Sequence, residues 1–142
     1  MTKALPYNQK TIDEFHARNG RGIAPWGDNL LLLTAKGFKT GTEITTPAVY
    51  RHRDGKYVVV GSGGGSPDEP KWVRNVKEHP EVAIEVAAAE GTQHIAVRGR
   101  VVAGGPERDE LYAYMTEVWP AFADYQEKTD RVIPVVVLEP ID

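Results

Sequence analysis

The chain has 142 residues, of which 41% are hydrophobic and 26% charged, and its formal net charge is −3. This length suits one domain with its own core, and the composition excludes disordered and fibrous proteins. With no cysteine, the chain forms no disulfide and holds no cysteine-ligated metal. The negative charge argues against a nucleic-acid partner, and the longest aliphatic run, Leu30 to Leu33, is too short for stable membrane insertion.

The first half of the chain predicts one helix followed by three strands. Ile12 and Phe15 lie at helical spacing within residues 8–19, and a loop bearing glycine and proline follows. Strands are expected at residues 29–35, 43–53 and 56–60. The Asp54-Gly55 pair between the last two runs is typical of a two-residue hairpin turn.

The second half predicts three helices among three further strands. Ser66 as a cap, Pro67 in the first turn and Glu69 predict a helix from Ser66 to about His79. The other expected elements are strands at 81–88, 92–103 and 132–138 and helices at 106–118 and 121–127. About six mainly antiparallel strands with three to four helices indicate an α+β barrel or sheet. We expect one domain over residues 1–142, in which residues 1–28 form an N-terminal helix and loop.

Several kinds of site are excluded by their motifs. The turn around Lys39 lacks the Gly-Lys-Ser/Thr ending of a phosphate-binding loop, and no Gly-x-Gly-x-x-Gly fingerprint is present. Val60 occupies the position where a nucleophile elbow around Ser62 needs glycine. None of the 4 histidines has a metal-ligand spacing, so we expect no metal.

Two segments are poorly explained by structure alone, and the first is the basic turn at residues 36–47 (KGFKTGTEITTP). Lysine and glycine in a turn offer a cation together with exposed backbone N–H groups. These groups suit a phosphate or a carboxylate. An ordinary β-turn with solvated lysines is the alternative.

The second segment is the glycine-rich stretch at residues 61–75 (GSGGGSPDEPKWVRN). Consecutive glycines lose much backbone entropy on folding and suit a backbone that must approach a ligand closely. Trp72 and Asn75 lie one helical turn apart, so an aromatic plane and an amide can address one planar ligand. The alternative is a flexible loop followed by a tryptophan that belongs to the core.

Together these segments resemble the deazaflavin (F420)-dependent nitroreductase family, whose members are F420-dependent reductases of the split β-barrel fold. The resemblance runs from about Leu30 to Pro140. It is carried by Leu31-Leu32-Leu33-Thr34, Lys39-Thr40-Gly41, Thr46-Pro47, the segment 57–65, Pro70-Lys71-Trp72, Asn75, His79-Pro80 and the segment 125–134. It implies an FMN-binding split-barrel-like fold and coenzyme F420, an 8-hydroxy-5-deazaflavin with an oligoglutamate tail.

The resemblance also implies which stretches surround the coenzyme. The lysine-bearing turn would contact its phosphate and tail, while the stretch after the third strand and the start of the next helix would lie along its ring system. The residues implied are Phe38, Lys39, Thr40, Gly41, Ile44, Thr45, Thr46, Pro47, Val60, Gly61, Ser62, Gly63, Lys71, Trp72, Val73 and Asn75. Arginines that the family often carries at positions 38 and 44 are missing, which leaves tail binding more to Lys39 and Lys36.

The resemblance implies a substrate wall made of Trp119, Phe122 and Tyr125. Members of the family best known for nitroimidazole reduction carry tyrosines at these positions, and here only Tyr125 keeps a hydroxyl. We therefore expect a drier, more aromatic wall, with Tyr125 or water as the proton donor. Alternatively, these side chains only pack a helix onto the barrel.

The expected function is hydride transfer from reduced deazaflavin to a small electron-poor acceptor. Acceptors of this kind are α,β-unsaturated ketones and lactones such as coumarins, quinones and, less well, nitroaromatics. An FMN-dependent split-barrel oxidoreductase and a non-catalytic deazaflavin or lipid carrier are the alternatives. We expect a cytoplasmic protein that is a monomer or a homodimer.

Overall fold

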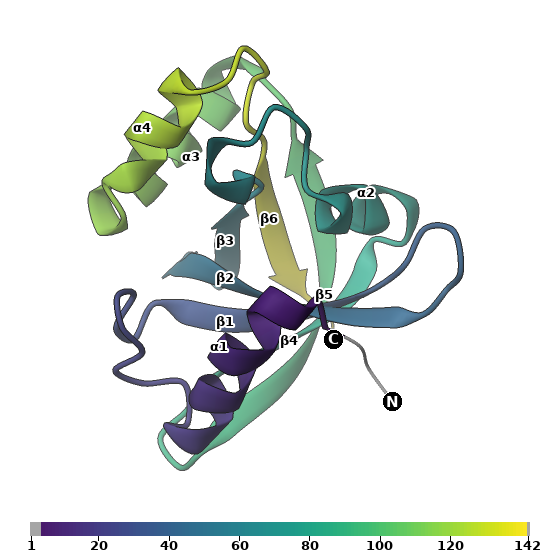
Figure 1. Ribbon diagram of the computed structural model, residues 1–142, viewed down its shortest axis with the longest axis vertical. Coiled ribbons are helices and arrows are strands. Elements are labelled where there is room, and N and C mark those ends of the chain that lie inside the picture. Colours follow the sequence, from purple (N-terminus) through teal and green to yellow (C-terminus); the bar gives the residue numbers. More distant parts are fainter. Residues whose placement is uncertain (1–3, 142) are drawn as a thin grey trace.

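Six strands close into an antiparallel barrel in the computed structural model, which describes residues 4–141 (Figure 1). In chain order the elements are α1 (Pro6–Ala17), β1 (Leu30–Lys36), β2 (Glu43–Arg53), β3 (Lys56–Val60), a short 3₁₀ turn η1 (Gly63–Gly65), α2 (Lys71–Glu78), β4 (Glu81–Ala87), β5 (Thr92–Val102), α3 (Gly105–Val118), α4 (Ala121–Glu127) and β6 (Val135–Pro140). Around the barrel the strand order is β1-β2-β3-β6-β5-β4. The predicted α+β split barrel is confirmed.

The strand β1 is an unbroken apolar run because both of its faces are buried. Leu31 and Leu33 belong to a cluster to which strands from around the barrel contribute, and which fills its interior. Leu30 and Leu32 point the other way and pack with residues of α1, among them Phe15. Since side chains alternate along a strand, only a continuous apolar run can serve both faces.

The hairpin between β2 and β3 forms at the predicted Asp54-Gly55 pair. Both residues have positive φ, 53° at Asp54 and 76° at Gly55, as a tight two-residue turn requires. The turn sets the register that pairs Arg53 with Lys56 and Tyr50 with Val59.

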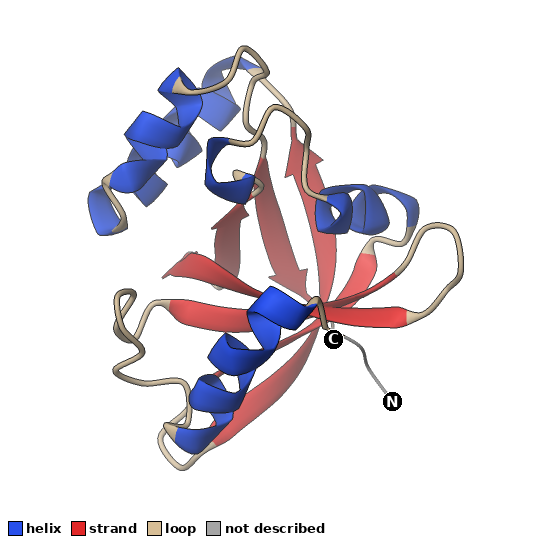
Figure 2. Ribbon diagram, viewed as in Figure 1, coloured by secondary structure: helices blue, strands red, loops and turns tan. Residues whose placement is uncertain are grey.

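The helices cover different parts of the barrel, as the secondary-structure view shows (Figure 2). α3 and α4 bury Leu111, Met115 and Phe122 against residues of β3 and β6. α2 lies against β5, and a Cβ added at Gly99 would come within 2.4 Å of Val76 Cγ1. Glycine at position 99 therefore allows α2 to approach β5 closely.

One predicted helix boundary is wrong. α2 begins at Lys71 rather than near Ser66, and the Ser66 hydroxyl donates to the carbonyl of Asp68 instead of capping a helix. Pro70 is the reason, because a proline inside a helix has no backbone N–H to donate and its ring clashes with the preceding turn. The final strand also begins later than predicted, at Val135, directly after Pro134.

None of the helices in residues 4–141 combines the length and the apolar character that a membrane crossing needs.

Candidate functional site

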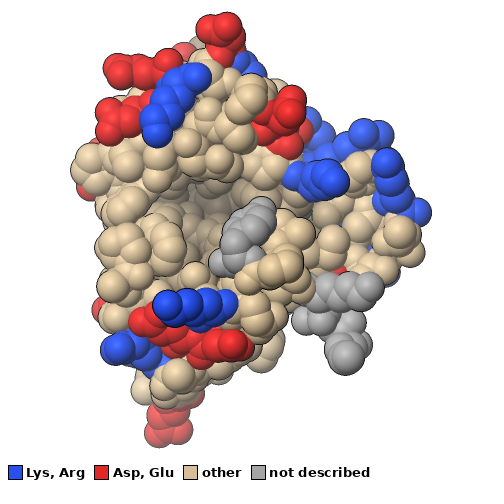
Figure 3. Space-filling model, viewed as in Figure 1, with Lys and Arg blue, Asp and Glu red and all other residues tan. Residues whose placement is uncertain are grey.

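A cavity of about 690 Å³ opens beside the barrel, with residues of α1, α2 and α4 around it. Figure 3 shows a hollow in this face of the molecule whose surroundings are mainly uncharged. Its walls come from β2, the end of β3, the start of α2 and the region from Trp119 to Tyr125. The two segments that the sequence singled out therefore meet at one place.

Most of the predicted site residues line this cavity. They are Ile44, Thr46, Pro47, Val60, Ser62, Gly63, Lys71, Trp72, Asn75, Trp119, Phe122 and Tyr125. The predicted residues that do not line it are Phe38, Lys39, Thr40, Gly41, Thr45, Gly61 and Val73. The wall also contains residues that sequence reasoning missed, namely Leu5, Asn8, Thr11, Trp26, Leu30, Ala48, Val49, Gly64, Glu69 and Pro70.

Three of the predicted residues serve the fold around the cavity rather than its surface. Thr45 lies on the opposite side of β2, where its hydroxyl is 2.7 Å from that of Thr34. Val73 is fully buried, and a Cβ added at Gly61 would lie 2.6 Å from Val73 Cγ2. Gly61 therefore lets the end of β3 pass directly beneath α2.

The basic turn between β1 and β2 is attached to α2 by Asn75. The Phe38 N–H donates a 2.8 Å hydrogen bond to Asn75 Oδ1, and Asn75 is only 3% exposed. The same asparagine lines the cavity. One buried amide thus links the turn that carries Lys39 to the wall of the cavity.

A basic edge, which we define as Lys39, Lys71 and Arg74, lies beside this turn. The Arg74 guanidinium sits 4.2 Å from the centre of the Phe38 ring, and Lys39 Nζ sits 5.7 Å from the same centre. Figure 3 shows Lys and Arg gathered on the side of the molecule where α2 and the turn lie. Within residues 4–141, no carboxylate forms an ion pair with the basic edge. The nearby carboxylate of Glu69 pairs instead with Lys77, at 3.2 Å. Its positive charge is therefore available to a ligand.

The glycine loop, which we define as residues 61–66, needs glycine for several different reasons. Gly63, Gly64 and Gly65 all have positive φ, at 55°, 67° and 86°. A Cβ at Gly65 would lie 2.8 Å from the carbonyl oxygen of Tyr125, so the loop passes against the backbone of α4. A Cβ at Gly64 would meet nothing within 4 Å, although Gly64 lines the cavity. The loop is thus a shaped part of the wall rather than a slack connection.

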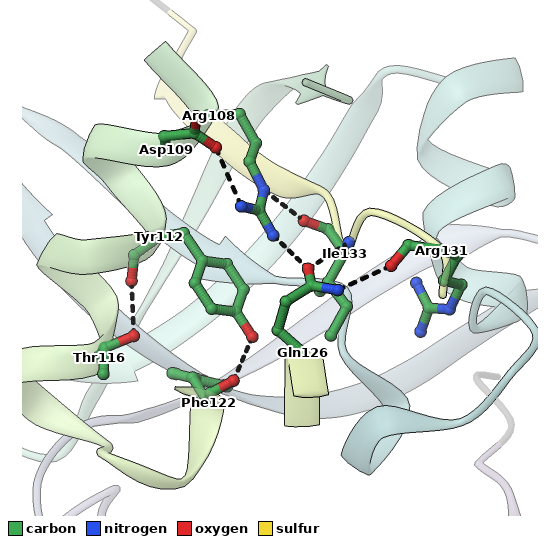
Figure 4. Close-up of polar contacts among 8 residues, drawn as sticks. All are labelled: Arg108, Asp109, Tyr112, Thr116, Phe122, Gln126, Arg131 and Ile133. Carbon is green, nitrogen blue, oxygen red and sulfur yellow. Dashed lines mark hydrogen bonds and ion pairs between the residues drawn. The ribbon is translucent and has the colours of Figure 1, made fainter. Parts of the chain in front are cut away.

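Arg131 fastens this loop from the C-terminal side. Its guanidinium donates to the carbonyl oxygens of Ser62 at 2.8 Å, Ser66 at 3.0 Å and Gly61 at 3.3 Å. Figure 4 shows the polar network behind it, in which Gln126 lies between Arg108 and Arg131. Gln126 Nε2 donates to the Arg131 carbonyl at 2.8 Å. The network joins α3, α4 and the segment before β6 behind the loop.

The aromatic wall of the cavity consists of Trp26, Trp119, Phe122 and Tyr125, and its α4 part lies next to the glycine loop. Trp119 and Trp26 have ring centroids 6.5 Å apart, and those of Phe122 and Tyr125 are 6.0 Å apart. Trp119 Nε1 donates to the Tyr125 hydroxyl at 3.4 Å, which leaves the hydroxyl's own proton for another acceptor. Among the missed residues, Trp26 had one sequence signal, an aromatic between Pro25 and Gly27 in a loop.

Comparison with known proteins agrees with this geometry. Residues 7–140 match the model of the F420H(2)-dependent quinone reductase family. An F420H(2)-dependent quinone reductase of Mycobacterium tuberculosis is 36% identical over 131 residues, covering 87% of this chain and 83% of that protein.

Solved structures agree as well. A structure described as an F420-H2 dependent reductase is 34% identical, with a TM-score of 0.69, and the match covers 78% of this chain and 94% of that one. A second, described as a domain-swapped dimer, is 29% identical with a TM-score of 0.70 over 94% of this chain and 97% of that one. The resemblance read from the sequence is thereby confirmed. This chain belongs to the F420H(2)-dependent quinone reductase family, and is an oxidoreductase with the split-barrel fold.

Proposed function

We propose that the cavity binds coenzyme F420 and that the protein reduces quinones with it. The observation that supports this most directly is that an apolar, aromatic cavity adjoins a basic edge that has no ion-pair partner within residues 4–141, in a chain of this family. A planar ring system suits the cavity, and an anionic tail suits the edge. When bound, the reduced coenzyme supplies the hydride, and the protein binds and orients both partners.

The residues present fit such a coenzyme. A volume of about 690 Å³ lies within the range of about 300–1,000 Å³ that is typical of small-molecule sites. Trp72 offers an aromatic plane, and the glycine loop offers backbone without side chains. A cradle of this shape accepts a flat tricyclic ring more readily than a branched ligand.

We infer that Arg74 compensates for the arginines that are missing at positions 38 and 44. Its guanidinium lies over Phe38, so α2 supplies an arginine beside the turn that lacks one. Together with Lys39 it offers charge-assisted hydrogen bonds to phosphate or carboxylate oxygens. We infer that the phosphate and oligoglutamate tail runs from the cavity along this basic edge.

The aromatic wall favours flat acceptors. Trp26, Trp119 and Phe122 present apolar surface and ring planes to the cavity, which favours stacking of a quinone or a coumarin-like lactone. Tyr125 contributes a hydroxyl group to this wall, and Trp119 orients the hydroxyl by donating a hydrogen bond to it. We infer that Tyr125 or water delivers the proton that completes reduction.

The two alternative functions have less support. Family membership favours F420 over FMN and favours an enzyme over a carrier. The cytoplasmic location stays a prediction, and so does the choice between monomer and homodimer, although one similar structure is a domain-swapped dimer.

Titration with F420, followed by fluorescence, tests the binding step directly. We expect F420 to bind in the micromolar range or tighter, and reduced F420 to drive reduction of menadione. NADPH should support no reduction. Purification of the protein with bound FMN, or turnover with NADPH as fast as with reduced F420, would contradict the proposal. Binding without any turnover would favour the carrier.

A further inference from the structure

Arg131 makes an unusual set of contacts for an arginine near a cavity. Its guanidinium donates four hydrogen bonds to three backbone carbonyls of the glycine loop, those of Gly61, Ser62 and Ser66. Within residues 4–141 it forms no ion pair with a carboxylate. Arg131 itself is not among the residues that line the cavity, whereas Ser62 and Gly63 are. The guanidinium therefore approaches the loop from behind.

Peptide geometry turns this contact into a statement about the cavity side of the loop. The Gly61 carbonyl shares a peptide unit with the Ser62 N–H, and the Ser62 carbonyl shares one with the Gly63 N–H. In a trans peptide the C=O and N–H groups point in opposite directions. Holding both carbonyls toward Arg131 therefore turns both N–H groups away from it.

The two N–H groups have no acceptor within the described chain. The backbone bonds of the loop run from Gly61 N–H to Pro134, from Gly65 N–H to Ser62 and from Ser66 N–H to Gly63. Ser62 and Gly63 donate to no atom of residues 4–141. Ser62 is 8% exposed and Gly63 is exposed, and both line the cavity. Two unpaired N–H groups at the wall of a cavity are donors that a ligand in the cavity can use.

We propose that Arg131 is a positioning residue that acts through the glycine loop. By holding the carbonyls of Gly61 and Ser62, it aims the N–H groups of Ser62 and Gly63 into the cavity. There they donate hydrogen bonds to the acceptor edge of the coenzyme's ring system, an inference that rests on the proposed function. The positive charge also polarises both peptide units and strengthens both N–H donors.

The loop needs such a restraint because of its composition. Glycine residues have wide backbone freedom, so Gly63, Gly64 and Gly65 would sample many conformations if nothing held them. The guanidinium limits that freedom before the coenzyme arrives, which lowers the ordering cost of binding.

Variants at position 131 test the proposal. In Arg131→Gln we expect the dissociation constant for F420 to rise about tenfold or more, because a charged, forked donor is lost. Arg131→Lys should recover part of the affinity, since an ammonium reaches some of the carbonyls but not all together. Arg51→Gln is the matched control, because Arg51 donates to the Tyr114 carbonyl at 2.9 Å and lies outside the cavity wall. Titrations are made at a temperature at which thermal unfolding shows every variant to be folded.

Amide signals give a readout that a purely structural role would not move. In an NMR titration of the parent with F420, the amides of Ser62 and Gly63 should shift and become protected from exchange with water. In Arg131→Gln these changes should shrink at saturating F420. Equal affinity and equal amide shifts in parent and variant would overturn the inference, as would an equal loss in Arg51→Gln. A parent that does not bind F420 overturns the proposed function as well, whereas a parent that binds leaves the function standing.

Discussion

Two hollows in this molecule differ in what their polar groups do. The cavity described above keeps its basic edge unpaired and leaves two loop N–H groups without an acceptor in the described chain. A second hollow of about 520 Å³ lies between α1 and the outer face of the barrel. There the polar side chains bind one another.

Glu85 is the centre of the second hollow. Its carboxylate accepts a 2.6 Å hydrogen bond from Thr92 and lies 3.0 Å from His16 Nε2, while His94 Nε2 is 3.6 Å away. Burial alone would raise the pKa of Glu85, but the hydrogen bonds from Thr92 and His16 and the nearby imidazoles lower it below its ordinary value. The comparison teaches that a concave shape does not identify a site. Polar groups left unused by the protein do.

Asn75→Ala should have the largest effect, because it breaks the link between the basic turn and the cavity. The partly buried Phe38 N–H would lose its acceptor, which costs about 1–3 kcal/mol of unfolding free energy. F420 affinity should fall as well, since the turn is no longer held. Thermal unfolding and F420 titration measure both. Thr45→Val, which removes a hydroxyl contact in the second hollow, is the control and should leave F420 affinity unchanged.

Normal F420 affinity in Asn75→Ala, despite lost stability, would mean that this asparagine serves the fold alone. The cavity and the second hollow would then differ less than we infer.

Removing charge from the basic edge should have the next largest effect. Lys39→Ala and Arg74→Ala should each weaken F420 binding by about 1–2 kcal/mol, because charge-assisted contacts to the tail are lost. The loss should shrink as salt rises, because exposed charges are screened. Lys56→Ala is the control, since Lys56 pairs with Glu139 on β6 at 3.7 Å and lies outside the cavity wall. An unchanged dissociation constant in both variants at low salt would show that these cations are only solvated.

The aromatic wall should control acceptor choice by a smaller amount. We expect the parent to reduce menadione or a coumarin faster than a bicyclic nitroimidazole, because stacking contributes about 0.5–1.5 kcal/mol per aromatic pair. Phe122→Tyr should narrow the gap by adding a proton donor. The backbone there is held in both proteins, because the Tyr112 hydroxyl donates to the Phe122 carbonyl. Values of kcat/KM for one acceptor of each kind measure the change.

Phe122→Leu separates the ring from the hydroxyl in this experiment. It removes the aromatic plane without adding a proton donor. It should therefore lower kcat/KM for the flat acceptors and give no increase in kcat/KM for the nitroimidazole. Equal rates for both acceptors in the parent, with no change in either variant, would leave only a packing role for Phe122.

The second hollow should affect only stability, and only slightly. The pKa of Glu85 is lower in the folded protein than its ordinary value of 4.5, so its contribution is present above that value. It is lost as the pH falls through the lowered pKa, when the carboxylate takes up a proton. Glu85→Gln should lower the free energy of unfolding at neutral pH by about 1 kcal/mol or less. It should also make that free energy depend less on pH in the acid range. Denaturant unfolding between neutral pH and acid measures this, and a change in F420 affinity would contradict our division of the two hollows.

Local and periodic patterns in the sequence predicted the strands and an α+β barrel or sheet, and the family resemblance then implied the split barrel. The apolar run from Leu30 to Leu33 favours a strand that is buried on both faces, and the Asp54-Gly55 pair favours a tight turn. Neither preference depends on distant parts of the chain. The family could also be recognised from the sequence, because its short motifs and their order along the chain can be identified without knowing which residues are in contact. Twelve of the coenzyme and substrate residues that the resemblance implied line the cavity.

Only the tertiary structure decided how the site is supported. Arg74 reaches Phe38, Trp26 reaches Trp119, and Arg131 reaches the loop at Gly61 across long stretches of chain. No local pattern encodes such contacts, because they depend on how the closed barrel places its loops. The start of α2 was mispredicted because two local signals compete. Ser66 and Pro67 carry a good helix signal, but Pro70 prevents a helix from running through it, so α2 begins at Lys71 and the Ser66 carbonyl accepts a hydrogen bond from Arg131.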